Sequence, residues 1–183
     1  MISSWEIDNL CESQQFFAFS RAYLKSSIAL CSRIQRLRRT PRYPDATVVL
    51  FLARHAVELF LKGAIIARSP KAKLHHDLER LKSKYDQLYC EAQFSWTLPF
   101  TTEFPGMSPA QLSKAKKHTL PCEQVFRYPI DNAGAKWTGV FALEPGAFKR
   151  EMLAARKEMS RLEQRISTAN KTLKGRHRRR GTS

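Results

Sequence analysis

Cysteine is scarce in this chain, and its four copies match neither a zinc site nor a redox motif. They contain no C-x-x-C pair and no ligand spacing typical of zinc. The four are Cys11, Cys31, Cys90 and Cys122. We therefore predict a reduced protein of the cytoplasm, with no metal site and no cofactor.

The chain also lacks segments that would lead it into or across a membrane. Its N-terminus, MISSWEIDNL, has no basic region followed by an apolar run, so we predict no signal peptide. One stretch, residues 48–67, is mostly apolar, but it carries Arg54, Glu58 and Lys62 near its centre. Charges at that depth are costly in lipid. We therefore expect the central helix of a bundle and no membrane partner.

Acidic residues are half as numerous as basic ones. The 183 residues include 16 Asp and Glu against 32 Lys and Arg, which gives a net charge of +16. Residues 171–183 hold six of the basic residues and no acid, so the rest of the chain still carries +10. A basic body of this kind predicts a polyanionic partner, and we expect RNA or another nucleic acid.

The C-terminal segment, residues 171–183, is too short and too biased in composition to fold by itself. We predict that this basic tail is disordered. It is either a solvated end or a salt-sensitive clamp on phosphates. The residues that would contact nucleic acid are Lys174, Arg176, Arg178, Arg179 and Arg180.

Hydrophobic spacing predicts four main helices. They cover about residues 9–39, 46–67, 77–90 and 145–168. Pro41 and Pro44 separate the first two helices, and Asp45 is the expected N-cap of the second. The second helix is apolar on most of its circumference, so it should lie in the centre of the fold. Its expected buried residues include Leu52, Leu59 and Ile66.

The segment before the last helix does not follow a helical period. A short helix can start at Ser108, and residues 125–143 contain two β-prone runs, QVFRYPI and KWTGVFAL, around the turn-like DNAGA. The aromatic residues in and near this segment could stack on bases, but we expect them to pack a loop onto the core. They are Trp96, Phe100, Phe104 and Trp137.

The predicted fold is therefore mainly all-α. We expect one domain, residues 1–170, built as a four-to-five-helix up-and-down bundle. A small irregular β-hairpin should precede the last helix, and no internal repeat is present.

Polar residues are concentrated on the second helix and at the start of the third. Arg54, Glu58 and Lys62 recur every four residues and form a polar stripe, with His55 beside it. An exposed stripe would be a ladder of weak ion pairs, whereas a buried one must pair its charges. We expect Glu58 to pair with Arg54 or Lys62.

The third helix begins with a paired histidine, His75 and His76, followed by Asp77. One interpretation is a helix cap, because Asp at an N-terminus complements the dipole and bonds free amides. The other is a catalytic or phosphate-binding role, since imidazole titrates near neutrality. Both stay open at this point.

The runs HAVELFLKGAII and HHDLERL resemble the helix pair of HEPN domains, which occur in bacterial toxin, defence and nucleotidyltransferase systems. FRYPID before the last helix recurs in some members. The resemblance implies a dimeric helical bundle. Many members are metal-independent ribonucleases in which an Arg is followed, four to six residues later, by a His. Arg68 and His75 have this spacing.

If the resemblance extends to activity, Arg68 would hold the phosphate and His75 would transfer protons. The alternates are His76, Arg54 and His55. Other members lack catalysis and bind nucleic acid or a larger effector protein. The last helix as predicted, about residues 145–168, contains no His, where nuclease members usually carry the motif, which favours the binding role. The implied partners are RNA, a second copy of the chain, and an antitoxin or effector protein.

Overall fold

The computed structural model describes residues 5–37, 42–100 and 143–180, with side chains for residues 7–170 of these ranges. The elements are α1 (Trp5–Asp8), α2 (Glu12–Arg36), α3 (Tyr43–Arg68), α4 (Leu78–Leu88), the 3-10 helix η1 (Ala92–Phe94) and α7 (Pro145–Arg180). The described part of the chain contains no strand, so the mainly all-α class is confirmed there. The helix expected from Ser108 and nearly all of the expected β-hairpin lie outside the described residues.

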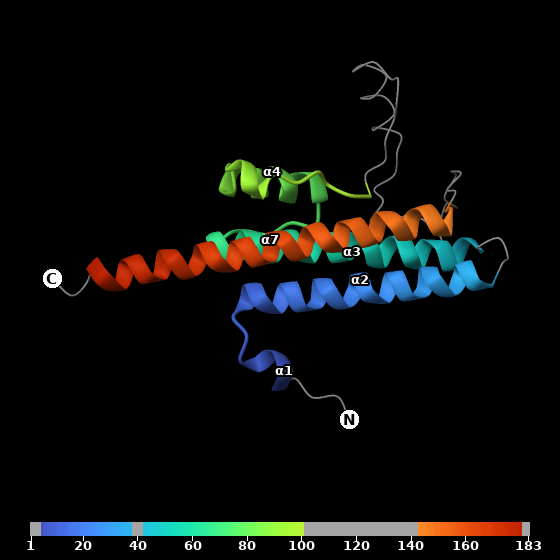
Figure 1. The fold of residues 1–183 in the computed structure, drawn as a ribbon, viewed down its shortest axis with the longest axis horizontal. Coiled ribbons are helices and arrows are strands. Elements are labelled where there is room, and N and C mark those ends of the chain that lie inside the picture. Colours follow the sequence, from blue (N-terminus) through green and yellow to red (C-terminus); the bar gives the residue numbers. More distant parts are fainter. Residues whose placement is uncertain (1–4, 38–41, 101–142, 181–183) are drawn as a thin grey trace, which may run out of the picture.

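The three long helices α2, α3 and α7 lie side by side, and α4 packs against α3 (Figure 1). Helix α2 runs antiparallel to α3, because hydroxyls of α2 reach carbonyls of α3 in reverse order. Ser20 Oγ donates to the Ala56 carbonyl at 2.7 Å, and Ser27 Oγ donates to the Val49 carbonyl at 2.8 Å. These two bonds satisfy buried hydroxyls at the helix interface.

Helix α7 runs parallel to α3, as the second and fourth helices of an up-and-down bundle do. Nδ2 of Asn170, late in α7, donates to the carbonyl of Ala67, at the end of α3, at 3.1 Å. The start of α7 lies at the other end, where Cys31 Sγ contacts the Pro145 carbonyl at 3.2 Å. Both contacts place the start of α7 at the end of the bundle where α3 begins (Figure 1).

The core is one cluster of apolar side chains drawn from α2, α3, α4, α7 and the segment after α4. Ile66 is buried as predicted, but Leu52 and Leu59 are only half-buried. Helix α3 therefore lies in the centre of the fold, but the face that carries Leu52 and Leu59 is only partly covered by other elements. The predicted packing of Trp96 and Phe100 onto the core is confirmed, and Phe104 and Trp137 lie outside the described residues.

Glycine at position 63 allows α2 and α3 to approach closely. A Cβ atom there would lie 2.9 Å from ring carbons of Phe17, closer than real contacts permit. The Phe17 ring in turn packs on Phe60, with centroids 5.4 Å apart. The position of the Phe17 ring is therefore set by a close backbone approach.

The start of α3 differs from the sequence prediction, whereas the start of α4 agrees with it. Helix α3 begins at Tyr43 with Arg42 as N-cap, so Asp45 lies in the first turn instead of capping it. Pro44 does not break the chain there, because proline is tolerated in the first turn, where its missing N–H would have no partner. The cap of α4 is as predicted: the Asp77 carboxylate accepts from the amides of Glu79 and Arg80 at 2.9 and 3.2 Å.

Helix α7 extends to Arg180, beyond the end expected near Thr168. The backbone of residues 171–180, which we predicted to be disordered, is helical. Nothing in this stretch stops a helix: it contains no proline, Lys and Arg are good helix formers, and cations near a C-terminus complement the dipole.

Among the described residues, every helix is too short or too polar to span a lipid bilayer.

Candidate functional site

Glu58 of α3 lies at the centre of a cluster of charged and titratable side chains. Its carboxylate is only 4% exposed, and Oε1 accepts a hydrogen bond from Nζ of Lys62 at 2.7 Å. Nδ1 of His76 lies 2.9 Å from the same oxygen, and Nδ1 of His55 lies 3.3 Å from Oε2. The predicted ion pair is confirmed for Glu58 and Lys62. We call these four residues the Glu58 cluster.

The cluster keeps a carboxylate ionised in a buried position. Burial by itself raises the pKa of Glu58, since it disfavours the charged form. Hydrogen bonds from His55 and Lys62, together with the positive charge of Lys62, outweigh burial and lower the pKa of Glu58 to about 2. Glu58 is therefore a fixed negative charge at any physiological pH.

His76 is the exposed member of the Glu58 cluster. Its side chain is 73% exposed, yet Nδ1 is held against the buried carboxylate. A carboxylate beside Nδ1 fixes the orientation of the ring and leaves Nε2 as the nitrogen that can exchange a proton with an outside molecule. Glu58 and His76 thus have the geometry of an oriented acid–base pair.

His55 has a different environment. Its ring lies between Tyr23, edge-on at 4.7 Å, and Phe51, stacked at 5.5 Å, and its side chain is 20% exposed. The aromatic contacts hold the imidazole on one side of Glu58. His55 therefore orients the carboxylate and is poorly placed to meet a substrate.

Arg54 does not join the Glu58 cluster, so the three-residue stripe is divided. Nη1 of Arg54 donates to the carbonyl of Phe100 at 2.8 Å, while its buried Nε has no hydrogen-bond partner within the described residues. Phe100 has φ of 60°, a strained value for a bulky residue. Its amide donates to Oε1 of Glu151 at 3.1 Å. Arg54 thus secures a turn of the chain.

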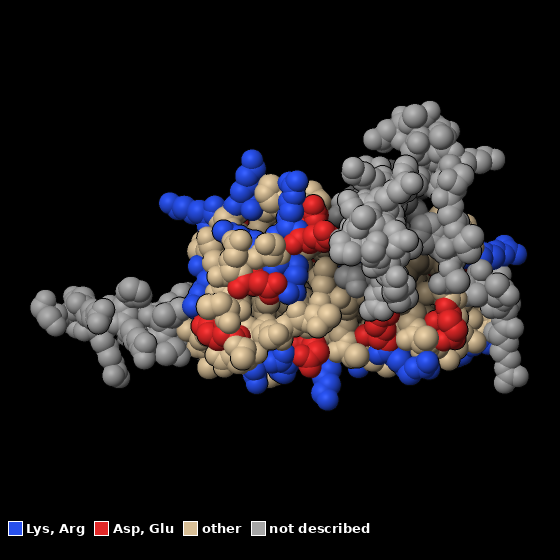
Figure 2. Space-filling view, turned by 90° about the horizontal axis from the view of Figure 1, so that it is seen from above, with Lys and Arg blue, Asp and Glu red and all other residues tan. Residues whose placement is uncertain are grey.

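A basic groove lies beside the Glu58 cluster, between the end of α3, the loop 69–77 and α4. Its volume is about 410 Å³, and Ile65 and Leu81 form part of its floor. No acidic residue lines it. Its charged and titratable lining residues are all exposed: Lys73, His75, Arg80 and Lys84. Figure 2 looks onto the α4 side of the molecule, where Lys and Arg side chains project from the surface.

The cations of this basic groove are not equally available. Nε of Arg80 lies 3.3 Å from Oδ2 of Asp77, so the capping carboxylate partly neutralises it. Lys73 and Lys84 have no ion-pair partner in the described part of the chain. Together with His75 they make the groove an anion-binding surface.

Arg68, the first member of the predicted Arg68–His75 pair, contacts Tyr89. The guanidinium of Arg68 stands over the ring of Tyr89, 5.8 Å from its centroid, and Arg68 does not line the basic groove. Tyr89 is itself fixed, because its hydroxyl donates to the Ala64 carbonyl at 2.9 Å. Burial raises the pKa of Tyr89 to about 12. Arg68 therefore packs on a neutral ring at the end of α3.

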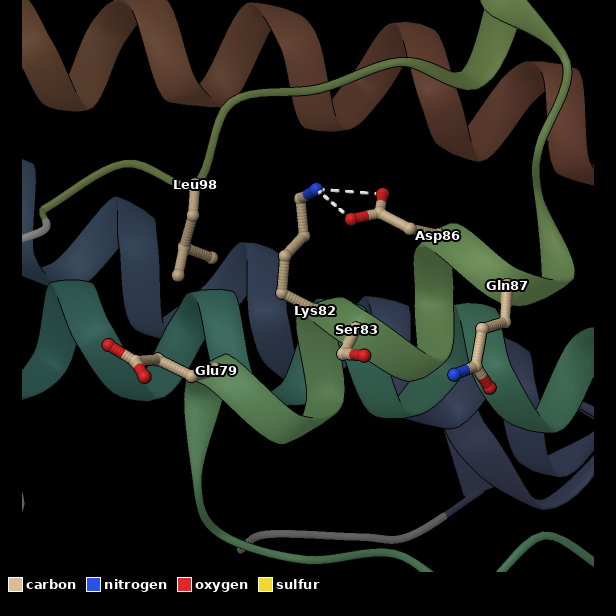
Figure 3. Close-up of a pocket in the computed structure, with 6 residues that line it drawn as sticks. All are labelled: Glu79, Lys82, Ser83, Asp86, Gln87 and Leu98. Carbon is tan, nitrogen blue, oxygen red and sulfur yellow. Dashed lines mark hydrogen bonds and ion pairs between the residues drawn. The ribbon is translucent and has the colours of Figure 1, made fainter.

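A second, shallower groove runs along α4 on the side of Leu98 (Figure 3). Its cation is already paired: Nζ of Lys82 donates to both carboxylate oxygens of Asp86, at 2.7 and 2.6 Å. Glu79 also lines this groove. The two carboxylates of this groove outnumber its single ammonium group, which would repel an anion. We therefore do not place a phosphate site in it.

The described residues contain no group of three or more His, Cys, Asp and Glu side chains that could hold a metal. The Glu58 cluster is unsuited to one, because the ammonium of Lys62 lies on the oxygen that a cation would need. A comparison of the chain with protein-family models, with curated proteins and with solved structures found no match.

Sequence reasoning missed two parts of this site. The basic groove needs Lys73 and Lys84 on one surface, and only the fold of the loop 69–77 against α4 brings them there. The bond from His76 to Glu58 spans 18 residues and has no local periodicity to reveal it. The one available signal was the paired histidine after a short basic loop.

Proposed function

We propose that this chain is a HEPN-like helical domain that binds RNA, with the basic groove as its phosphate-binding surface. The observation that carries the proposal is a groove lined by Lys73, His75 and Lys84 and by no acidic residue. Lysine ammonium groups that neutralise phosphates release counterions, which supplies sequence-independent affinity. The net charge of +16 steers any polyanion toward the molecule.

The course of α7 adds a second basic element. Because Asn170 bonds to Ala67, the segment that follows residue 170 starts at the same end of the bundle as the loop 69–77. That segment includes the predicted contacts Lys174, Arg176, Arg178, Arg179 and Arg180, whose side chains lie outside the described ones. Our proposal places the groove and this segment on one bound RNA strand.

The wider setting rests on the resemblance of residues 51–85 and 125–131 alone. We propose a cytoplasmic homodimer in a bacterial defence or toxin–antitoxin system, with an antitoxin or effector protein as a further partner.

The test measures RNA affinity by fluorescence anisotropy, with a labelled single strand of about 20 nucleotides in about 50 to 300 mM salt. The variant Lys73→Glu/Lys84→Glu changes the groove. The variant Lys25→Glu/Arg156→Glu changes an equal charge on the α2 and α7 surface, so both chains carry +12. We expect at least about tenfold weaker binding and a shallower salt slope for the groove variant alone. Equal losses in the two variants would refute the groove as the site.

A second candidate function, metal-independent RNA cleavage, is favoured by the Glu58–His76 pair, because His76 is the chain neighbour of the groove residue His75. A base would take the proton of a 2′-hydroxyl, whose oxygen attacks the adjacent phosphorus. The 5′-oxygen leaves with a proton from an acid, and a 2′,3′-cyclic phosphate forms. In this mechanism His75, which lines the groove, and the exposed His76 would transfer the protons, and Lys73 and Lys84 would hold the phosphate.

Cleavage is tested on single-stranded RNA in EDTA, with product ends analysed for cyclic phosphate. The catalytic hypothesis expects His75→Ala and His76→Ala to abolish cleavage while RNA binding is largely kept. Arg68→Ala should have less effect, because Arg68 does not line the groove. Binding without cleavage by the unaltered protein would leave RNA binding as the function and exclude the enzyme.

A further inference from the structure

A small apolar crevice lies between α2 and α7, separate from the basic groove. Its volume is about 190 Å³. Four side chains that are almost fully buried form its walls: Phe17, Leu24, Phe60 and Met159. Nothing in the described part of the chain fills this crevice, although it opens onto a highly charged surface.

The walls of the crevice are rigid. Phe17 is held between the Phe60 ring, 5.4 Å away, and the backbone at Gly63. Ser20, also at the crevice, is fixed by its bond to the Ala56 carbonyl at 2.7 Å. An apolar site with walls fixed in advance loses little conformational entropy when it is filled.

The rim of the crevice is basic. Arg21 and Glu163 form an ion pair with each other across the mouth, between α2 and α7. Lys25 and Arg156 also line the crevice, are exposed, and have no carboxylate partner within the described residues. The site thus combines an apolar interior with two available cations at its edge.

We propose that this crevice docks an acidic peptide segment of a partner protein, which inserts one large apolar side chain between α2 and α7. Two observations choose this occupant. The volume is below the 300–1,000 Å³ or so of small-molecule sites and suits a single anchor side chain. The unpaired Lys25 and Arg156 match carboxylates that flank the anchor, and the net charge of +16 attracts an acidic segment.

This proposal does not depend on RNA binding, because the crevice and the basic groove share no lining residue. The probe is a fluorescein-labelled peptide, Glu-Asp-Glu-Phe-Asp-Glu-Asp, titrated with the full chain and followed by anisotropy. Matched peptides replace its Phe by Ala, or its acids by Gln and Asn. We expect each replacement to weaken binding at least about tenfold, since anchor and charges both contribute.

Two protein variants locate the bound peptide. Lys25→Glu/Arg156→Glu should lose the Phe peptide, and Lys73→Glu/Lys84→Glu, with the same net charge, should keep it. Circular dichroism checks that both variants stay folded, as expected for exposed positions. Competition by single-stranded RNA should leave the peptide bound.

Several results would overturn the proposal. The proposal fails if the peptide does not bind at concentrations up to about 1 mM, or if the Phe and Ala peptides bind equally well. It also fails if the two charge variants lose the same amount of peptide affinity. Binding of 4-phenylbutyrate as tight as that of the peptide would assign the crevice to a small amphipathic carboxylate instead. Self-association that Lys25→Glu/Arg156→Glu abolishes, seen by sedimentation, would assign it to a second copy of this chain.

Discussion

Nδ1 of the exposed His76 lies 2.9 Å from Oε1 of the buried Glu58. This contact joins the loop before α4 to the middle of α3, so it serves both stability and the site. The carboxylate has three partners and almost no contact with solvent. A residue in this position should be costly to change.

We predict that Glu58→Gln destabilises the fold by about 3–5 kcal/mol, because it leaves the buried ammonium of Lys62 without its counter-charge. Asp86→Asn is the matched control, since Lys82 and Asp86 have the same i,i+4 spacing on an exposed surface. That change should cost no more than about 1 kcal/mol. Urea denaturation measures both. Similar values for the two variants would show that the Glu58 cluster is solvated.

The low pKa of Glu58 predicts how stability depends on pH. Burial acts to raise this pKa, but hydrogen bonds from His55 and Lys62 lower it to about 2, against an ordinary value of 4.5. Because the folded-state pKa is depressed, the contribution of Glu58 is complete above about pH 4.5 and is lost as the pH falls toward 2. The unfolding free-energy difference between the unaltered chain and Glu58→Gln should narrow over that interval. A difference that stays constant down to pH 2 would contradict the assignment.

Two leucines on α3 offer a comparison of burial on one helix. Leu61 has no exposed surface, whereas Leu59 is half-buried. Leu61→Ala should cost about 2–5 kcal/mol, the range for a core cavity. Leu59→Ala should cost clearly less in thermal or urea melts at low protein concentration. An equal cost that appears only at high concentration would reveal that a second molecule covers Leu59.

The N-cap of α4 can be tested with a conservative pair of variants. Asp77→Ala removes the acceptor for the amides of Glu79 and Arg80 and should cost about 1 kcal/mol. Asp77→Asn keeps a side-chain oxygen that can accept these bonds. Its free energy of unfolding should differ from that of the unaltered chain by only a few tenths of a kcal/mol. Equal losses in both would show that charge, and not capping, matters at this position.

Deletion of residues 171–183 should leave the melting temperature nearly unchanged. The side-chain contacts of α7 with α3 that we describe reach only to Asn170. The deletion removes six Lys and Arg residues, so RNA affinity should fall. The slope of log affinity against log salt concentration should become shallower by about 0.7 for each phosphate that the shortened chain no longer neutralises. An unchanged slope would exclude this segment from the RNA-binding surface.

Local features of the fold could be predicted from the sequence, and most long-range ones could not. The helices and the Asp77 cap follow from spacing and from side chains within four residues of the groups they bind. The partial exposure of Leu52 and Leu59 depends on which helices surround α3. The apolar sequence of α3 does not indicate which of its faces the neighbouring helices cover. The parallel course of α3 and α7 is the one that an up-and-down order gives to its second and fourth helices.

The candidate site shows the same division. The pairing of Glu58 with Lys62 is an i,i+4 contact and could be predicted. Arg68 and His75 have a suggestive spacing in sequence, but α3 ends at Arg68, and His75 lines the basic groove whereas Arg68 does not. A spacing across a loop fixes no distance, so only the structure could replace Arg68 by Lys73 and Lys84 beside His75.

Phe100 ties two helices together through its backbone. Its amide is bound by Glu151 of α7 and its carbonyl by Arg54 of α3, and these bonds hold φ at a strained 60°. Arg54 lies one helical turn before Glu58. A pull on the chain after Phe100 would therefore act on two helices together, on α3 through Arg54 and on α7 through Glu151.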